Sequence, residues 1–188
     1  MKIILGSASE NRQIILREMG LDFEVRPANI DEKAIRLNDP NALTMALARA
    51  KAKHLDGQFD EPVILITADQ VVTYQGQIRE KPRNAEEARK FLESYNHSPA
   101  KCHTAVVVTN AASGKQAEGT EVSTVYFQDF SDEEVNELIK SGEVYKYAGG
   151  FTVRGDQWRK HIQTIDGHED NVLGLPKELT RRLIEQVK

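Results

Sequence analysis

The chain has a single cysteine and no long hydrophobic run, and both absences restrict where it works. With Cys102 alone it can form no intramolecular disulfide, which agrees with a reducing compartment. No apolar segment approaches the length of a transmembrane helix, and the short run Ile3–Leu5 cannot form the core of a signal peptide. We therefore expect a cytoplasmic protein with no membrane partner. Cys102 is expected to be a packed, inert thiol, with a Cys–His catalytic pair as the alternative.

Basic blocks and flexible linkers are also missing. The formal net charge is −4, and Lys and Arg are spread along the chain. Nucleic acid is therefore not expected as a main partner, although a locally cationic pocket can still bind an anionic small molecule. No Pro-, Gly- or Ser-rich break divides the 188 residues, so we expect a single domain over 1–188, with one or two lobes.

Several familiar catalytic signatures do not occur. The sequence has no Gly-x-x-x-x-Gly-Lys-Ser/Thr loop, no His-Glu-x-x-His helix, no Gly-x-Ser-x-Gly elbow and no Gly-x-Gly-x-x-Gly turn. The usual P-loop, the zinc-protease helix, the serine-hydrolase elbow and the dinucleotide-binding turn are therefore excluded.

What the sequence does contain is an alternation of strand-like and helix-like segments. Strands are expected at 2–5, 23–27, 63–68, 71–74 with a return strand at 78, 105–109 and 122–127. Helices are expected from residue 10 to a stop at Gly20, from a cap at Asp39 or Asn41 to 55, over 84–95, from 131 to Gly142, and from Pro176 onward. This alternation is typical of an α/β fold.

The first residues combine a strand, a Ser-rich turn and a helix start. Gly6 permits a tight turn, and Ser7 and Ser9 place hydroxyls beside the unpaired N–H groups of the helix. Arg12 follows in the first turns, where its guanidinium can bind an anion that these N–H groups attract. The pattern indicates a phosphate cradle, with an ordinary helix N-cap as the alternative.

Further polar clusters fall at the ends of the predicted elements, where α/β proteins build ligand sites: Asp31-Glu32, Lys51, Asp69-Gln70 and Arg79-Glu80-Lys81-Pro82. Oxygen ligands such as Glu32 suit magnesium or manganese, while Lys and Arg neutralise phosphate oxygens. Together they meet the needs of metal-assisted phosphoryl chemistry. Taken singly, each has a simpler reading: solvated loop acids, a solvated helix face for Lys51, a strand-end cap for Asp69 and a turn residue for Lys81.

In their order along the chain, these clusters resemble the motifs of the Maf family of nucleoside triphosphate pyrophosphatases, also called septum formation inhibitors. Leu5-Gly6-Ser7-Ala8-Ser9-Glu10-Asn11-Arg12 is similar to the family's Leu-Ala-Ser-x-Ser-Pro-Arg-Arg opening. The later motifs match in the same order: Asp31-Glu32, Leu47-Ala48-x-x-Lys51-Ala52, Ala68-Asp69-Gln70-Val71-Val72, Lys81-Pro82, Ala148-Gly149-Gly150-Phe151 and Asn171-Val172-x-Gly174-Leu175-Pro176. The resemblance covers essentially the whole chain.

The resemblance implies a fold and an activity. The fold is α/β, a two-lobed domain with a mixed twisted sheet flanked by helices and a central nucleotide-binding cleft, similar to inosine triphosphatase. The activity is hydrolysis of a nucleotide between its α and β phosphates, which gives a monophosphate and pyrophosphate. A divalent cation, magnesium or manganese, and a homodimer are also implied.

The resemblance also implies a role for each matched residue. Asp69 matches the proton acceptor and Glu32 a metal-side carboxylate, so both are candidate metal ligands. Asp69, Lys81 and Glu32 form the candidate catalytic set. The candidate substrate-binding residues are Ser7, Ser9, Asn11, Arg12, Lys51, Gln70 and Arg154, with Lys81 also among the phosphate contacts.

Four positions bear on how closely the chain follows the family pattern. Glu10-Asn11 replaces the usual Pro-Arg, so one of two expected arginines is missing. Gln70 resembles the branch that acts on 7-methyl-GTP rather than the dTTP/UTP branch, whereas Arg154 stands where both branches carry Gln or Glu. The base specificity therefore stays open. The leading hypothesis is a metal-dependent pyrophosphatase acting on a modified or pyrimidine nucleotide; the alternatives are a catalytically weak, nucleotide-binding regulator of cell division and an ordinary phosphatase.

Overall fold

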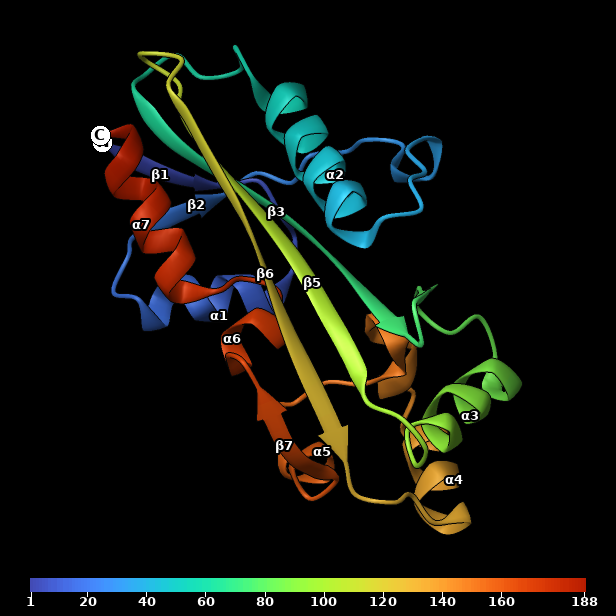
Figure 1. The fold of residues 1–188 in the computed structure, drawn as a ribbon. Helices are drawn as coiled ribbons and strands as arrows, with labels where there is room; N and C mark the ends of the chain where they lie inside the picture. The colour runs from blue at the N-terminus through green and yellow to red at the C-terminus, as the bar shows by residue number, and fades with distance from the viewer. The chain divides into compact units, whose positions relative to one another are not determined.

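A mixed seven-stranded sheet flanked by helices forms the framework of the computed structural model, which describes all residues 1–188 (Figure 1). The strands are β1 (Lys2–Leu5), β2 (Phe23–Val25), β3 (Val63–Tyr74), β4 (Gln77–Arg79), β5 (Ala100–Asn110), β6 (Gln116–Phe127) and β7 (Ile162–Asp166). The helices are α1 (Glu10–Glu18), α2 (Pro40–Leu55), α3 (Ala85–Ser94), α4 (Asp132–Ser141), α5 (Asp156–Arg159), α6 (Glu169–Val172) and α7 (Lys177–Val187), with 3₁₀ turns η1 (Glu32–Ala34), η2 (Glu143–Lys146) and η3 (Ala148–Gly150). The strand order is β2-β1-β3-β5-β6-β7, and β4 pairs with β3. The predicted α/β class is confirmed.

The chain packs as two compact units. The first comprises Met1–Gln70, Thr104–Glu121 and Leu173–Lys188, and the second comprises Val71–His103 and Val122–Val172. Strands β3, β5 and β6 contribute residues to both units. No helix of the structure combines the length and the apolar character that crossing a bilayer requires.

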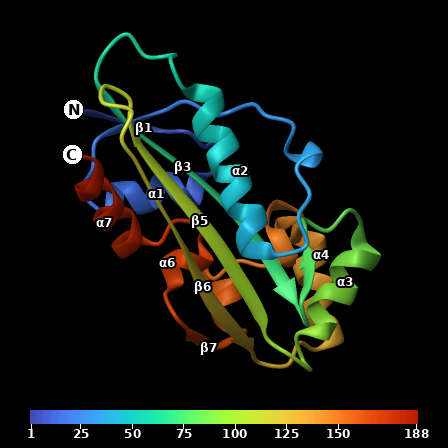
Figure 2. The same ribbon diagram turned by 45° about the horizontal axis from the view of Figure 1, so that its top comes forward.

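In the first unit, β1 pairs in parallel with both β2 and β3, with Leu5 opposite Val25 and Ile66. Parallel neighbours need crossover connections, and α1 and α2 supply them. Helix α2, which lies over β3 and β5 in Figure 2, packs Ala48, Ala52 and Leu55 on an apolar face of the sheet. The strand residues of this core are Ile4, Val63, Leu65, Ala105 and Val107. The core therefore fixes the position of α2 over β3.

The helices α2 and α7 cover opposite faces of the sheet. Arg49 of α2 forms an ion pair with Glu118 of β6. The next residue, Gly119, faces α7 instead, because a Cβ added to it would lie only 2.7 Å from Leu179 Cδ1. Successive residues of a strand point to opposite faces, so these two contacts lie on different sides. The small residue at 119 lets α7 approach closely.

The second unit has an aromatic core. The Tyr95 ring stacks on Phe127 with centroids 4.8 Å apart, and Phe151 meets both rings edge-on. Arg79, part of a polar cluster in the sequence, lies 3.9 Å over the Tyr74 ring centroid and donates from Nη1 to Ser94 Oγ at 2.8 Å. It therefore has a packing role in β4, where cation–π contacts hold it.

Most predicted caps are confirmed. Ser9, Asp39, Asn84 and Ser131 each accept a backbone hydrogen bond at a helix start, and α4 ends on Gly142 in the left-handed region. Helix α7 starts one residue after the expected Pro176.

Several strand predictions were wrong in extent, and β5 and β6 begin earlier than expected, at Ala100 and Gln116. The second strand ends at Val25 rather than residue 27, and the predicted break after residue 68 does not exist, because β3 runs unbroken from Val63 to Tyr74. Asp69 and Gln70 therefore lie inside a long strand and not at its end. Polar residues in a buried strand imitate a strand end when only the sequence is considered.

Candidate functional site

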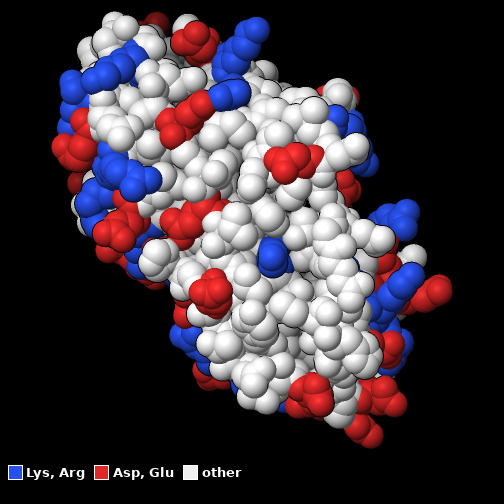
Figure 3. Space-filling view, in the orientation of Figure 1, with Lys and Arg blue, Asp and Glu red and all other residues white.

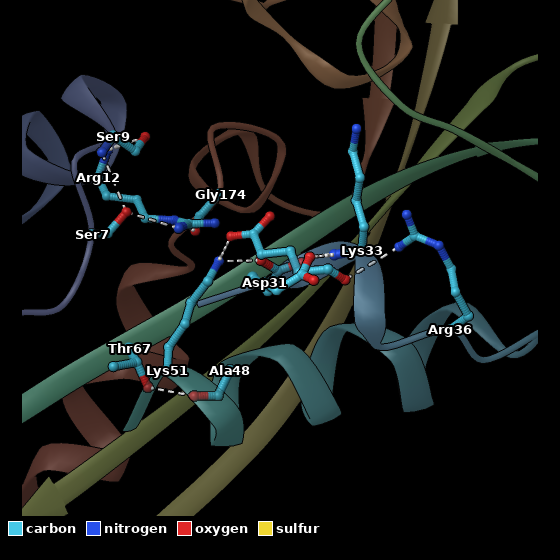
Figure 4. Close-up of polar contacts among 12 residues, drawn as sticks. Ser7, Ser9, Arg12, Asp31, Lys33, Arg36, Ala48, Lys51, Thr67 and Gly174 are labelled. Carbon is cyan, nitrogen blue, oxygen red and sulfur yellow. Dashed lines mark hydrogen bonds and ion pairs between the residues drawn. The ribbon is translucent and has the colours of Figure 1, made fainter. Parts of the chain in front are cut away.

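The serine-rich turn before α1 forms a small hydrogen-bonded nest around Arg12 (Figure 4). Ser9 is the N-cap, and its Oγ accepts from the backbone nitrogen of Arg12 at 3.5 Å. Ser7 Oγ accepts from the backbone nitrogen of Ser9 at 3.3 Å and from Arg12 Nη1 at 3.0 Å. Ser9 is thus the N-cap of α1, while Ser7 positions the guanidinium.

Gly6 acts by its small size rather than by a turn. Its backbone nitrogen donates to the Ile66 carbonyl at 2.8 Å, which extends the pairing of β1 with β3. A Cβ at this position would come within 2.6 Å of Thr67 Cγ2. The expected tight turn at Gly6 is therefore replaced by a close approach of backbone to β3.

Arg12 is a buried cation that forms no ion pair. The residue is only 8% exposed, and its Nε donates to the carbonyl oxygen of Gly174 at 2.8 Å. Burial lowers the pKa of Arg12, while the charges of Asp69 and Glu32 act in the opposite direction. Both partners that it contacts are neutral, so its charge is available to an anion beside the N-terminus of α1.

A second cluster places one ammonium group between two carboxylates. Lys51 Nζ of α2 lies 2.5 Å from Asp69 Oδ1 of β3 and 2.8 Å from Glu32 Oε1 of η1. Lys51 and Asp69 are each 7% exposed, whereas the Glu32 side chain is 53% exposed. The simpler reading of Lys51 as part of a solvated helix face is wrong, because its position on α2 faces β3. Asp31 serves as the N-cap of η1, where it accepts from the Lys33 nitrogen at 3.1 Å.

Asp69 has the electrostatic character of a base. Burial raises its pKa above the ordinary value, and the charges of Lys51 and Arg12 and the hydrogen bond from Lys51 oppose that rise. A carboxylate whose pKa is raised accepts a proton more readily than one in water. The side chain therefore combines ionic contacts with enhanced basicity.

Gln70, next along β3, points to the other face of the strand. Its Nε2 donates to Thr104 Oγ1 at 3.2 Å, and its Oε1 lies 3.7 Å from where a Cβ on Gly174 would be, close to Arg12. The first unit therefore has Asp69 on the α2 side of the strand and Gln70 on the side of the segment before α7.

Glu10 and Asn11, the two residues that differ from the family's opening motif, lie on α1. Asn11 is half-buried in the first turn, and Glu10 is exposed at its start. The structure thus brings together Ser7, Ser9 and Arg12 in one cluster and Glu32, Lys51 and Asp69 in another, both within the first unit.

Lys81 and Arg154 belong to the second unit. Lys81 is exposed, and the chain on both sides of it is held by the Gly149-Gly150 motif: the Gly149 nitrogen donates to the Glu80 carbonyl at 3.1 Å, and Pro82 packs against Gly150. Both glycines have positive φ, which a glycine adopts without strain. Arg154 is half-buried, and its backbone nitrogen donates to Thr152 Oγ1 at 3.3 Å. The glycine motif thus holds the segment that carries Lys81.

Cys102 is fully buried in β5, and burial raises its pKa to about 12. The neighbouring His103 side chain instead meets Thr73, with Nε2 3.0 Å from Thr73 Oγ1. The prediction of a packed thiol is confirmed, because so high a pKa leaves almost no thiolate to act as a nucleophile.

Sequence reasoning missed the residues that align the clusters. Thr67 Oγ1 donates to the Ala48 carbonyl at 2.9 Å. Thr67 lies two residues before Asp69 on β3, and Ala48 lies three residues before Lys51 on α2. Gly174 supplies the acceptor for Arg12, and Thr104 holds Gln70. The sequence did carry a signal for Thr67: it is a polar residue two positions before Asp69. Residues two apart in a strand point to the same face, so Thr67 and Asp69 share one.

Glu32 and Asp69 fit a divalent cation. Each turns one carboxylate oxygen to the same point, which Lys51 Nζ now fills, and carboxylate oxygens are the ligands that magnesium and manganese prefer. Figure 3 shows acidic and basic side chains interspersed over the face in view, without a wide area of one sign.

A model of the Maf family, described as Maf-like protein, matches residues 2–187. The chain belongs to the Maf family. Among curated relatives, the 7-methyl-GTP pyrophosphatase of Dictyostelium discoideum is 43% identical, over 98% of this chain and 96% of that protein. The dTTP/UTP pyrophosphatase of Pyrococcus furiosus is 37% identical, over 98% of this chain and 94% of the relative.

A solved structure of a Mycobacterium abscessus protein, described as a nucleoside-triphosphatase or dITP/XTP pyrophosphatase, has a TM-score of 0.45 and 11% identity, over 97% of this chain and 91% of that one. So weak a likeness is no basis for an assignment. The Maf-family relatives carry the comparison, and they are pyrophosphatases by name.

Proposed function

We propose that this Maf-family chain hydrolyses a nucleoside triphosphate to a nucleoside monophosphate and pyrophosphate, with residues 1–188 acting as one catalytic domain. The observation that carries the proposal is the buried Arg12 guanidinium, which has neutral partners only and lies at the start of α1. A buried cation beside a helix N-terminus whose hydrogen-bond partners are all neutral favours a phosphate ligand. The named activities of the relatives agree with that ligand.

Asp69 is the proposed general base. Its buried carboxylate has a raised pKa, so it can take a proton from the water that attacks the α phosphorus. The bond from water oxygen to phosphorus forms as the bond from phosphorus to the bridging oxygen breaks, and the leaving group is pyrophosphate. In the metal-free protein, Lys51 holds the Asp69 carboxylate through its hydrogen bond to Oδ1.

The cations of the site stabilise negative charge on the phosphates. Arg12 has a fixed direction, because Ser7 Oγ and the Gly174 carbonyl both accept from it. Such preorganised donors stabilise a transition state without having to reorient. Lys81 is proposed as a further phosphate contact. Magnesium or manganese, which Glu32 and Asp69 would hold, supplies Lewis-acid polarisation of the phosphoryl oxygens when bound.

The proposed substrate is a modified or pyrimidine nucleoside triphosphate, with Asn11, Gln70 and Arg154 among its contacts. The relative with 43% identity is named for 7-methyl-GTP, and Gln70 matches the corresponding branch of the family. We therefore place 7-methyl-GTP first for testing, ahead of dTTP and UTP. A cytoplasmic homodimer is the proposed working form.

A nucleotide panel in ¹⁸O-labelled water tests the activity. Purified protein is incubated with each triphosphate and magnesium or manganese. The products are separated, and their amounts and ¹⁸O content are determined by mass spectrometry. The proposal requires equal amounts of monophosphate and pyrophosphate, with ¹⁸O in the monophosphate. Orthophosphate as the first product would instead identify a phosphatase. Nucleotide binding without turnover, across the whole panel, would favour the regulator of cell division.

A further inference from the structure

Lys51 occupies the point that the two candidate metal ligands share. Its Nζ lies 2.8 Å from Glu32 Oε1 and 2.5 Å from Asp69 Oδ1, and Figure 4 shows the extended side chain reaching that point from α2. An ammonium group and a divalent cation cannot fill one place between the same two oxygens. Binding of the metal by Glu32 and Asp69 therefore requires the ammonium to leave at least one of them.

We propose that Lys51 is an exchangeable internal cation: it neutralises Glu32 and Asp69 in the metal-free protein and is displaced from them when the divalent ion binds. The inference rests on the metal-binding part of the proposed function. It makes Lys51 a positioning residue whose partner changes during the catalytic cycle, rather than a fixed phosphate contact.

The surroundings of Lys51 explain why a resident cation is needed. Asp69 is 7% exposed, and a buried carboxylate without a partner is costly. Arg12 contributes an attractive charge but forms no ion pair with Asp69. Lys51 is the one residue that ion-pairs Asp69, so removal of its charge without replacement leaves a buried anion.

The same surroundings explain how the exchange can occur. The ammonium is carried on a flexible four-carbon stem, whereas α2 itself is fixed by Ala48, Ala52 and Leu55 in the core. The head group can therefore move while the helix stays in place. A divalent ion offers twice the charge to the same two carboxylates. The displaced ammonium is then free to contact a phosphate that arrives with the metal.

Metal binding to the protein alone tests the exchange without catalysis. Mn²⁺ affinity is measured by electron paramagnetic resonance at pH 8, without nucleotide, for wild type, Lys51→Met and the matched control Lys53→Met, an exposed lysine on the same helix. Lys51→Met should bind Mn²⁺ about tenfold or more tightly, because the metal no longer competes with an ammonium. Lys53→Met should match wild type. Adding Glu32→Gln to Lys51→Met should abolish the gain.

Wild-type protein gives a second measurement in case Lys51→Met fails to fold. Lysines are acetylated with a limiting amount of reagent and quantified by mass spectrometry, with and without Mn²⁺. The labelling of Lys51 relative to Lys53 should rise severalfold when Mn²⁺ is added, since displacement exposes the amine. A folded Lys51→Met with unchanged or weaker Mn²⁺ binding, or a labelling ratio that Mn²⁺ leaves unchanged, would overturn the exchange.

These results are independent of the reaction. If the exchange is observed but no triphosphate yields pyrophosphate, the proposed function fails and the exchange stands. If pyrophosphate is released but Mn²⁺ leaves the acetylation of Lys51 relative to Lys53 unchanged, the proposed exchange is wrong and the proposed function is retained.

Discussion

Arg12 and Gly174 are 162 residues apart in sequence, and the guanidinium Nε of the first donates to the carbonyl oxygen of the second at 2.8 Å. Gly174 has a φ of +93°, and a Cβ there would lie 3.4 Å from Arg12 Nε. The glycine thus presents its carbonyl in a conformation that other residues adopt only under strain, and it leaves room for the arginine. The direction of the Arg12 guanidinium therefore depends on a segment near the other end of the chain.

Replacing Arg12 should therefore affect every substrate. Arg12→Ala removes a preorganised donor, and we expect kcat/KM to fall by about 10² to 10³ for all nucleotides. Arg12→Lys keeps the charge but cannot donate to Ser7 and Gly174 in the same geometry, so it should recover only part of the loss. Steady-state kinetics on three nucleotides measure this, with circular dichroism to establish folding. A loss confined to one nucleotide would contradict phosphate binding.

Replacing Asp69 tests the proposed base. Asp69→Asn keeps the size of the side chain but cannot take the proton, and turnover should fall by about 10² to 10⁴. Asp60→Asn, an acid outside both clusters, is the control and should leave turnover near wild type. A folded Asp69→Asn enzyme with wild-type turnover would remove Asp69 from the mechanism.

The pH dependence follows from the raised pKa of Asp69. The base works only when ionised, so activity should fall as pH decreases through a pKa that lies above the ordinary 3.8. Burial sets the direction of this shift, against the effect of Lys51 and Arg12. The profile of kcat/KM between pH 4 and 9 measures it at subsaturating metal, where the metal-free enzyme predominates, because a bound cation would lower the pKa of Asp69. An acidic limb at or below the ordinary carboxyl value would contradict the assignment.

Thr67 should matter for both alignment and stability. Thr67→Val removes the hydrogen bond to the Ala48 carbonyl and should lower the free energy of unfolding by about 1 kcal/mol. It should also lower kcat, because that bond sets α2, and with it Lys51, against β3. Thr44→Val is the matched control: Thr44 is also buried, but it bonds only to carbonyls of its own helix. Equal effects of the two changes on kcat would argue against an alignment role.

Specificity should separate from phosphate binding. Substitutions of Gln70 and Arg154 should change the ranking of nucleotides by kcat/KM, whereas Lys81→Ala should lower activity on all of them. Gln70→Glu is informative because it keeps the shape but replaces the amide that donates to Thr104. Unchanged rankings in both the Gln70 and Arg154 variants would exclude the two residues as base contacts.

The sequence predicted most of the elements that carry the first unit, because their signals are local. The residues that follow each cap predicted Ser131 directly, Asp39 as one of two candidates with Asn41, and the capping role of Ser9 as the alternative to a phosphate cradle. The extent of β3 was not predicted, because Asp69 and Gln70 interrupt its apolar pattern, and their compensating partners come from α2 and β5. Strand β7 was missed, since its half-exposed residues form no apolar run.

The candidate site was predicted as a set of residues but not as an arrangement. The ordered motifs named Arg12, Glu32, Lys51 and Asp69, yet nothing local indicated that Lys51 would lie between the two acids. That geometry depends on packing of α2 over β3 through the core, which is a property of the whole unit.

The alternation of β3 places Asp69 and Gln70 back to back, with the proposed base against α2 and the amide on the opposite surface of the strand. Adjacent codons thus encode side chains with separate environments. A substitution at position 70 therefore leaves the ion pair of Asp69 in place, so the proposed nucleobase contact can be changed without loss of the proposed general base.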